Sequence, residues 1–263
     1  MCDFSYETLA IEVSDAGIAS VVLNRPEKRN ALSALMIAEL TDMAQTLGAA
    51  RSTRAIVLSG AGDVFCAGGD LDWMKAQIAA DRQGRMREAR KLAEMLRALN
   101  EMPTPLIGKV HGGAFGGGVG LICVCDVALA AAGTKFGLTE TRLGLIPATI
   151  GPYVVARLGE GMARRVFMSS RIFGAIEAVE LGLIAEAPDV TALDGAVDAH
   201  VRPYLSAAPE AVGAAKALAR ALGPRIDDSV MEDTIARLVE TWEAEEARQG
   251  IEAFLAKRSA PWS

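Results

Sequence analysis

Apolar and polar residues alternate near the start of the chain in the manner of strands. Residues 7–13 and 17–23 alternate or run apolar, and they flank a polar Ser-Asp-Ala turn at 14–16. This pattern predicts a pair of strands joined by a short turn. After a polar loop at 24–30, Ser33 is expected to cap a helix from about 34 to 50. Its apolar face would comprise Leu35, Ile37, Leu40, Met43 and Leu47.

Two later segments share one plan of strand, glycine-rich loop and helix. The apolar run 54–59 leads into a glycine-rich loop at 60–69, after which Asp70 is expected to cap a helix. The apolar run 105–110 leads into a second glycine cluster at 111–120 and a helix-length apolar segment. Amides at a helix N-terminus are free, and the helix dipole favours negative charge there. Side by side, the two loops can each supply one amide to a shared anion site.

The remaining pattern is mostly helical. Residues 75–97 are expected to form one charged helix, whose basic face either is solvated or meets ligand phosphates. Short helices are expected at 153–158, 161–169 and 175–181, followed by either a brief strand or an extended piece at 182–186. From 191 on, the pattern predicts three helices, with breaks near Pro209 and Gly223-Pro224. We therefore divide the chain into a core at 1–190 and a helical region at 191–263, with no flexible linker between them.

Composition limits the classes of function. Apolar residues make up 51% of the 263 residues, which is enough for a substantial core. The net charge of −6 disfavours broad nucleic-acid binding. The first six residues lack the features of a signal peptide, and no apolar run reaches membrane-spanning length. The sequence therefore predicts a cytoplasmic protein with neither a nucleic-acid nor a membrane partner.

The four cysteines do not follow the spacing of a disulfide framework or a zinc site. They stand at Cys2, Cys66, Cys123 and Cys125, and the last two are separated by one residue. We interpret them as reduced, buried thiols in a reducing compartment. No metal site is predicted.

Glu140 is the residue that most suggests chemistry. It stands twenty residues after Gly120 and has Leu138, Leu143 and Leu145 close by in sequence. A carboxylate in apolar surroundings has a raised pKa and can exchange protons near neutral pH. Free amides for an anion together with one such carboxylate are typical of chemistry through an enolate. Taken alone, Glu140 would more often be a surface or capping acid, and its position among these leucines and after the glycine cluster favours the chemical role.

The other polar residues have plainer interpretations. The glycine run at 116–118 is compatible with a tight turn or with a phosphate cradle. It lacks the Lys-Ser or Lys-Thr of a P-loop and the spacing of a dinucleotide fingerprint. Asp126 is expected to make buried hydrogen bonds, and His111 to have a structural role rather than a ligand contact.

Several motifs, taken in order, resemble the crotonase superfamily of enoyl-CoA hydratases and isomerases. The resemblance spans nearly the whole chain, and the motifs are specific only in combination. They are the segments 24–32 (NRPEKRNAL), 55–62 (AIVLSGAG), 65–71 (FCAGGDL), 112–118 (GGAFGGG), 125–126 (CD), 144–147 (GLIP) and 254–258 (FLAKR).

The resemblance implies an α/β fold: a spiral of ββα turns with a helical C-terminal trimerisation region, assembled as a homotrimer or homohexamer. It implies an acyl-CoA thioester substrate and no cofactor beyond the coenzyme A of that substrate. By match to the motifs, Gly69 and Gly117 supply the two oxyanion-hole amides, and Glu140 moves a proton at the thioester α-carbon. The backbone at Ala67, Gly69, Asp70 and Leu71 would meet the adenine end of coenzyme A. Lys28 and Arg29 would lie near its phosphates.

One position departs from the two-glutamate pattern of hydratases. The first glutamate would lie at Gly120, which is also counted among the substrate-binding positions. The single-glutamate pattern resembles enoyl-CoA isomerases, and also a bacterial branch assigned to methylglutaconyl-CoA and related branched-chain hydration. We expect hydration of an α,β-unsaturated, branched-chain acyl-CoA, with ordered water or a polar substrate group in the space left at Gly120. The alternatives are a double-bond isomerase and an inactive acyl-CoA-binding member.

Overall fold

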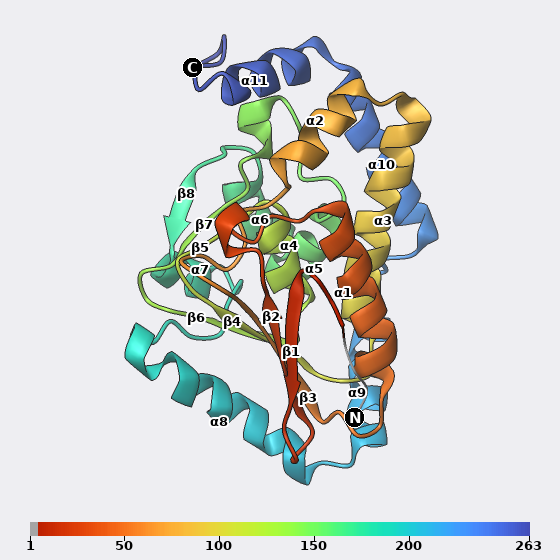
Figure 1. Ribbon diagram of the computed structural model, residues 1–263, viewed down its shortest axis with the longest axis vertical. Coiled ribbons are helices and arrows are strands. Elements are labelled where there is room, and N and C mark those ends of the chain that lie inside the picture. The colour runs from red at the N-terminus through yellow and green to blue at the C-terminus, as the bar shows by residue number, and fades with distance from the viewer. Residues whose placement is uncertain (1–4) are drawn as a thin grey trace.

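The larger of two sheets forms the centre of the molecule (Figure 1). The computed structural model describes residues 5–263. The sheet has the order β1 (Leu9–Val13), β2 (Ile18–Leu23), β3 (Ala55–Gly60), β4 (Leu106–Val110) and β6 (Val127–Ala130). β1 and β2 pair antiparallel and all later neighbours pair parallel. The predicted first strand pair and the strands before both glycine loops are thus confirmed.

A second, smaller sheet consists of three short strands that the apolar pattern did not predict. It has the order β5 (Gly113–Phe115), β7 (Lys135–Gly137) and β8 (Ile172–Gly174). Each strand has three residues, too few for a visible alternation, and Phe136 stacks on Phe173 with ring centroids 5.6 Å apart. Because β5 lies within the second glycine cluster and β7 leads toward Glu140, this sheet brings the cluster and Glu140 to the same place.

The first helices follow the predicted caps, with one interruption. Helix α1 (Ala34–Thr46) begins at Ser33, whose hydroxyl accepts from the Met36 amide, and continues as a 3₁₀ turn, η2 (Leu47–Ala49). The single helix predicted for 75–97 is wrong. The structure has α2 (Leu71–Ala79) and α3 (Arg82–Glu101), because Asp81 caps a new helix start at the Gly84 amide.

The basic face of α3 meets another helix. Arg82, Arg90 and Arg97 pair with Glu243, Glu232 and Asp228 of α10 (Asp228–Glu243). These arginines therefore join two helices, which neither interpretation of the charged face had anticipated.

The middle of the chain forms short helices close to those predicted. They are α4 (Gly117–Val124), α5 (Gly151–Leu158), α6 (Glu160–Phe167) and α7 (Ala175–Glu180). Residues 182–186 form no strand of their own. The Ala185 amide and the Glu186 carbonyl bond to β6, so the segment is extended along that edge, as the alternative prediction had it.

Four helices, rather than the expected three, follow residue 191. They are α8 (Leu193–Ser206), α9 (Pro209–Leu222), α10 and α11 (Glu245–Leu255), with the unpredicted break at Ala244. Helix α8 packs against the large sheet, and α10 and α11 share an apolar cluster with α2 and α3 (Figure 1). Helix α9 has no buried residue.

The thiols of the described chain match the prediction of reduced, buried cysteines. Cys66, Cys123 and Cys125 are buried and free, and burial raises the pKa of each thiol to about 12. Cys2 lies outside the described residues. Within residues 5–263, no helix combines the length and the apolar character needed to cross a bilayer.

Candidate active site

The Gly69 amide is left free by the pairing around it. Leu32 donates to the Gly68 carbonyl at 2.8 Å and accepts from the Asp70 amide at 3.1 Å, so it bridges across Gly69. In a parallel bridge of this kind, the middle residue's own N–H points away from the partner strand. The Gly69 amide accordingly donates to no acceptor within the described chain.

Cys66 holds the first glycine loop against the second. Its amide donates to the Gly113 carbonyl at 3.2 Å, and its carbonyl accepts from Phe115 at 3.0 Å. The contact leaves no room for side chains, since a Cβ at Gly118 would lie 2.6 Å from the Cys66 oxygen and one at Gly68 would lie 2.9 Å from the Phe115 oxygen. The two loops therefore lie side by side, as their shared plan predicted.

Gly117 supplies the second free amide. It begins α4, and its N–H has no acceptor among residues 5–263. The turn before it requires glycine, because Gly116 has φ 48° and ψ −114°. The amide thus stands at a helix N-terminus, where the dipole favours negative charge.

Glu140 lies next to this turn with its carboxylate out of water. It begins a 3₁₀ helix, η3 (Glu140–Leu143), and a Cβ on Gly116 would lie 3.0 Å from its Oε1. Its Oε2 is buried and has no hydrogen-bond partner within the described chain. Burial raises the pKa of Glu140 to about 7, although a hydrogen bond from its own amide opposes the shift. A carboxyl with this pKa can take up and release a proton at neutral pH.

The segment that carries Glu140 is anchored on two sides. Thr141 Oγ1 donates to the Met168 carbonyl at 3.1 Å, and Arg142 donates to the Ser170 carbonyl at 3.2 Å. Helix α11 lies against the opposite side so closely that a Cβ on Gly250 would lie 2.6 Å from the Leu143 backbone.

These groups open onto one cavity of about 620 Å³. Most of the predicted site residues line it: Lys28, Arg29, Ala67, Gly69, Leu71, Gly117 and Glu140. Its walls also include residues that the sequence did not indicate: Trp73, Met74, Ile146, Thr149, Ile150, Trp242 and Phe254. They come from α2, the 146–150 segment, α10 and α11, and no spacing in the sequence relates these parts. The site therefore combines two free amides and one proton-exchanging carboxyl with a largely apolar wall.

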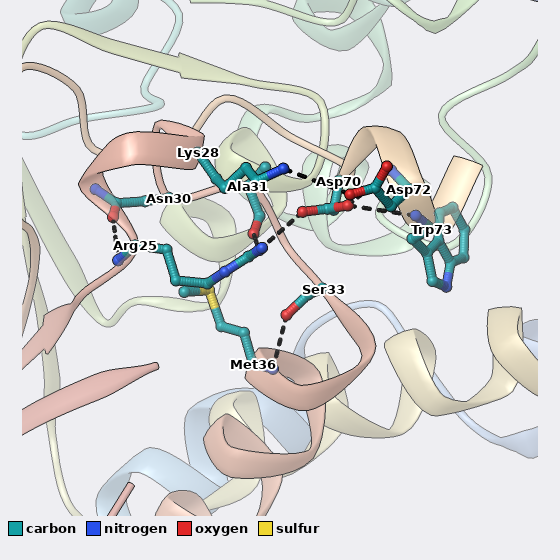
Figure 2. A network of polar contacts seen from close by, with 9 residues as sticks. All are labelled: Arg25, Lys28, Asn30, Ala31, Ser33, Met36, Asp70, Asp72 and Trp73. Atoms are coloured by element: carbon teal, nitrogen blue, oxygen red, sulfur yellow. Dashed lines mark hydrogen bonds and ion pairs between the residues drawn. The ribbon is translucent and has the colours of Figure 1, made fainter. Parts of the chain in front are cut away.

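The Asp70 side chain faces away from this cavity. It caps α2, accepting from the Asp72 amide at 2.8 Å and the Trp73 amide at 3.3 Å, as predicted. It also forms an ion pair of 2.9 Å with Arg25 (Figure 2). Burial raises the pKa of Asp70, but Arg25 and the two amides outweigh burial, so the pKa lies below its ordinary value. Only its backbone can meet a ligand in the cavity, and that contact stays a prediction.

Arg25 also braces the extended segment that pairs with Gly69. Its guanidinium donates to the Ala31 carbonyl at 2.7 Å, next to Leu32, while it holds Asp70 on the other side of Gly69 (Figure 2). Buried Asn30, at φ 52°, accepts from the Arg25 amide. This network fixes the direction of the Gly69 amide.

The space expected at Gly120 is not there. A Cβ on Gly120 would lie 2.5 Å from Ile150 Cγ2, and Leu96 lies beyond at 3.7 Å. Ile150 is 3% exposed and fills the position that a longer side chain would occupy. The prediction of ordered water or a polar substrate group beside Gly120 is therefore wrong, because an apolar side chain from a distant segment has taken that room.

Asp126 and His111 both make hydrogen bonds within the protein, although Asp126 is half-buried rather than buried. Asp126 accepts from the Leu106 amide and from Lys216, both at 2.8 Å. His111 Nε2 lies 2.8 Å from the Gly62 carbonyl, which ties the two glycine loops together.

Residues 13–263 match the sequence profile of the family described as enoyl-CoA hydratase/isomerase. The chain belongs to this family. A curated relative, enoyl-CoA hydratase ACTT6 of Alternaria alternata, is 35% identical over 82% of this chain and 69% of its own length.

Solved structures of the family share the fold. The crystal structure of an enoyl-CoA hydratase from Shewanella pealeana superposes with a TM-score of 0.81 at 34% identity, covering 99% of this chain and 97% of that one. Pseudomonas aeruginosa AtuE superposes with a TM-score of 0.80 at 38% identity, covering 97% and 99%. The crotonase fold expected from the motifs is thus confirmed.

The raised pKa of Glu140 makes the stability of the protein depend on pH. Between pH 4.5 and about 7, the unfolded chain has lost this proton while the folded chain keeps it, so stability falls as pH rises. A change from 4.5 to about 7 corresponds to at most about 3 kcal/mol. We expect the unfolding free energy of Glu140→Gln to equal that of wild type near pH 4.5. Above that pH the variant should be the more stable protein, by an amount that grows up to pH 8.

Urea unfolding of both proteins across this pH range measures the difference. Glu12→Gln, which changes an exposed carboxylate on β1, is the matched control. A Glu140→Gln difference that does not grow with pH would show that the carboxyl is not desolvated in the folded protein.

Proposed function

We propose that this protein hydrates an α,β-unsaturated acyl-CoA thioester, with branched acyl chains in its substrate range. One observation carries the proposal: the free amides of Gly69 and Gly117 open onto the same cavity as a buried carboxyl whose pKa is raised to about 7. Two amides suit a thioester oxygen that gains negative charge, and each such donor contributes roughly a hundred- to a thousandfold in rate.

The reaction needs only one carboxylate if that group both takes and returns a proton. Ionised Glu140 accepts a proton from water as the water oxygen bonds to the β-carbon. The electrons of the double bond move toward the thioester, whose oxygen is held by the Gly69 and Gly117 amides. Glu140 then delivers its proton to the α-carbon, which completes the addition of water and regenerates the carboxylate.

The cavity mouth suits the rest of the thioester. Lys28 and Arg29 are exposed cations at the border of the cavity, where they can face coenzyme A phosphates. Lys28 is 3.4 Å from Asp72, an exposed pair that a phosphate can displace at small cost. Ala67 and Leu71 border the same cavity and leave its wall apolar for the adenine.

A double-bond isomerase is the second candidate, and the filled space at Gly120 favours it. Isomerisation moves a proton between two carbons, which Glu140 can do alone. Ile150 fills the room beside Gly120 where ordered water was expected. A third candidate, an inactive acyl-CoA-binding member, would retain the cavity and bind thioesters without turnover.

Turnover in oxygen-18 water separates these functions. With a panel of linear and branched enoyl-CoA thioesters, we expect loss of the conjugated absorbance and heavy oxygen at the β-carbon of the product. A shifted double bond without heavy oxygen in every substrate would establish the isomerase instead. Thioester binding without any change of product would establish the inactive binder.

The activity should follow the ionisation of Glu140. Because the mechanism begins from the carboxylate, kcat/KM should fall as pH drops through an apparent pKa of about 7 and reach a plateau above it. Glu140→Gln should lose nearly all turnover and keep thioester binding within a few-fold. Wild-type turnover in this variant would remove Glu140 from the mechanism.

We further propose a homo-oligomer based on a trimer. Helix α9 supports this, because none of its residues is buried although it carries Leu218 at 61% and Leu222 at 80% exposure. Light scattering should give a multiple of 27.6 kDa at micromolar concentration, and Leu218→Glu combined with Leu222→Glu should lower that mass. A wild-type particle of 27.6 kDa would contradict the proposal.

A further inference from the structure

Thr149 is a buried hydroxyl with nothing to bond in the described protein. It is 5% exposed and lines the cavity that contains Glu140 and the free amides. No side-chain hydrogen bond to or from it occurs within residues 5–263, and its oxygen is not sealed from water as the hydroxyl of Thr134 is. The hydroxyl is therefore free to hydrogen-bond to a water or a ligand that enters the cavity.

The segment that carries Thr149 is held by hydrogen bonds on both sides. Its neighbour Ile150 fills the room over Gly120, and the Ile150 carbonyl accepts from the Tyr153 and Val154 amides at the start of α5. On the other side, the Gly151 amide donates to the Ala148 carbonyl at 3.0 Å. Thr149 is therefore held in place before any substrate enters, which reduces the cost of ordering the group it binds.

The other polar side chains of the cavity are less suited to hold water over the β-carbon. Lys28 and Arg29 are exposed at its border, Arg142 is tied to the Ser170 carbonyl, and the Trp73 ring N–H faces Glu88. Thr139, directly before Glu140, is half-buried and is the one rival hydroxyl among the described cavity residues.

We propose that the Thr149 hydroxyl positions the water that adds to the β-carbon, in place of the water site that Ile150 excludes at Gly120. The proposal rests on the hydratase function above. One hydrogen of the water points to the Glu140 carboxylate, which takes it. The other points to Thr149 Oγ1, which accepts it as a hydrogen bond and retains its own proton. The water oxygen then bonds to the β-carbon, and the product hydroxyl stays beside Thr149.

The test separates water addition from proton exchange. Exchange of the α-proton of a saturated acyl-CoA in deuterium oxide uses Glu140 and the two amides but needs no added water. In Thr149→Val, which keeps the shape and removes the hydroxyl, we expect kcat for hydration to fall about tenfold or more, with KM and α-proton exchange within about threefold of wild type. Thr149→Ser should restore most of the hydration rate.

Thr134→Val is the matched control, because it deletes a buried, unpartnered hydroxyl outside the cavity, and its hydration should be unchanged. Hydration at the wild-type rate in Thr149→Val would overturn the proposal. Equal losses of hydration and exchange would overturn it as well, because they indicate a merely structural role. A loss of hydration in Thr139→Val but not in Thr149→Val would also overturn the proposal, because it would assign the water-positioning role to Thr139. A wild type that exchanges α-protons but adds no oxygen-18 would refute the proposed function itself.

Discussion

The close contact between two glycine loops is the constraint on which the site depends. The Cys66 carbonyl lies where a side chain on Gly118 would be, so the loops can approach only as bare backbone. Leu32 hydrogen-bonds to the first loop, and the Gly137 carbonyl accepts from Gly116 in the second. These bonds leave the amides of Gly69 and Gly117 without acceptors in the described chain. Two donors that belong to distant parts of the sequence therefore share one pocket.

A second glycine of the same loop, Gly116, affects the state of the carboxyl. Gly116 needs a backbone conformation that only glycine tolerates, and its lack of a side chain lets Glu140 pack beside it. This packing removes the carboxyl from water, and the desolvation raises its pKa to about 7. The buried carboxyl and the free amides thus both depend on glycines of the two loops.

The sequence allowed the fold class and the chemical groups to be predicted, because strands, caps and glycine loops are local signals and the family motifs keep a fixed order. It did not show β5, β7 and β8, whose three residues each are too few for a periodic pattern. Nor did it show that Ile150 fills the room at Gly120 or that the Asp70 carboxylate faces Arg25, since both depend on which distant segments meet. The Thr149 hydroxyl gave no signal at all, because a lone threonine has no characteristic spacing.

The last helix has a consequence for how this protein comes to be active. Gly144 and Gly250 let the backbones of η3 and α11 touch, so the segment carrying Glu140 is completed by residues about 100 positions later in the chain. During synthesis the N-terminal parts emerge and fold first. The glycine loops can therefore form while the protein is still being made, but the carboxylate segment has its full support only after α11 has left the ribosome. A chain that is stopped or trimmed before α11 would keep the two free amides and lose the support of the segment that carries Glu140.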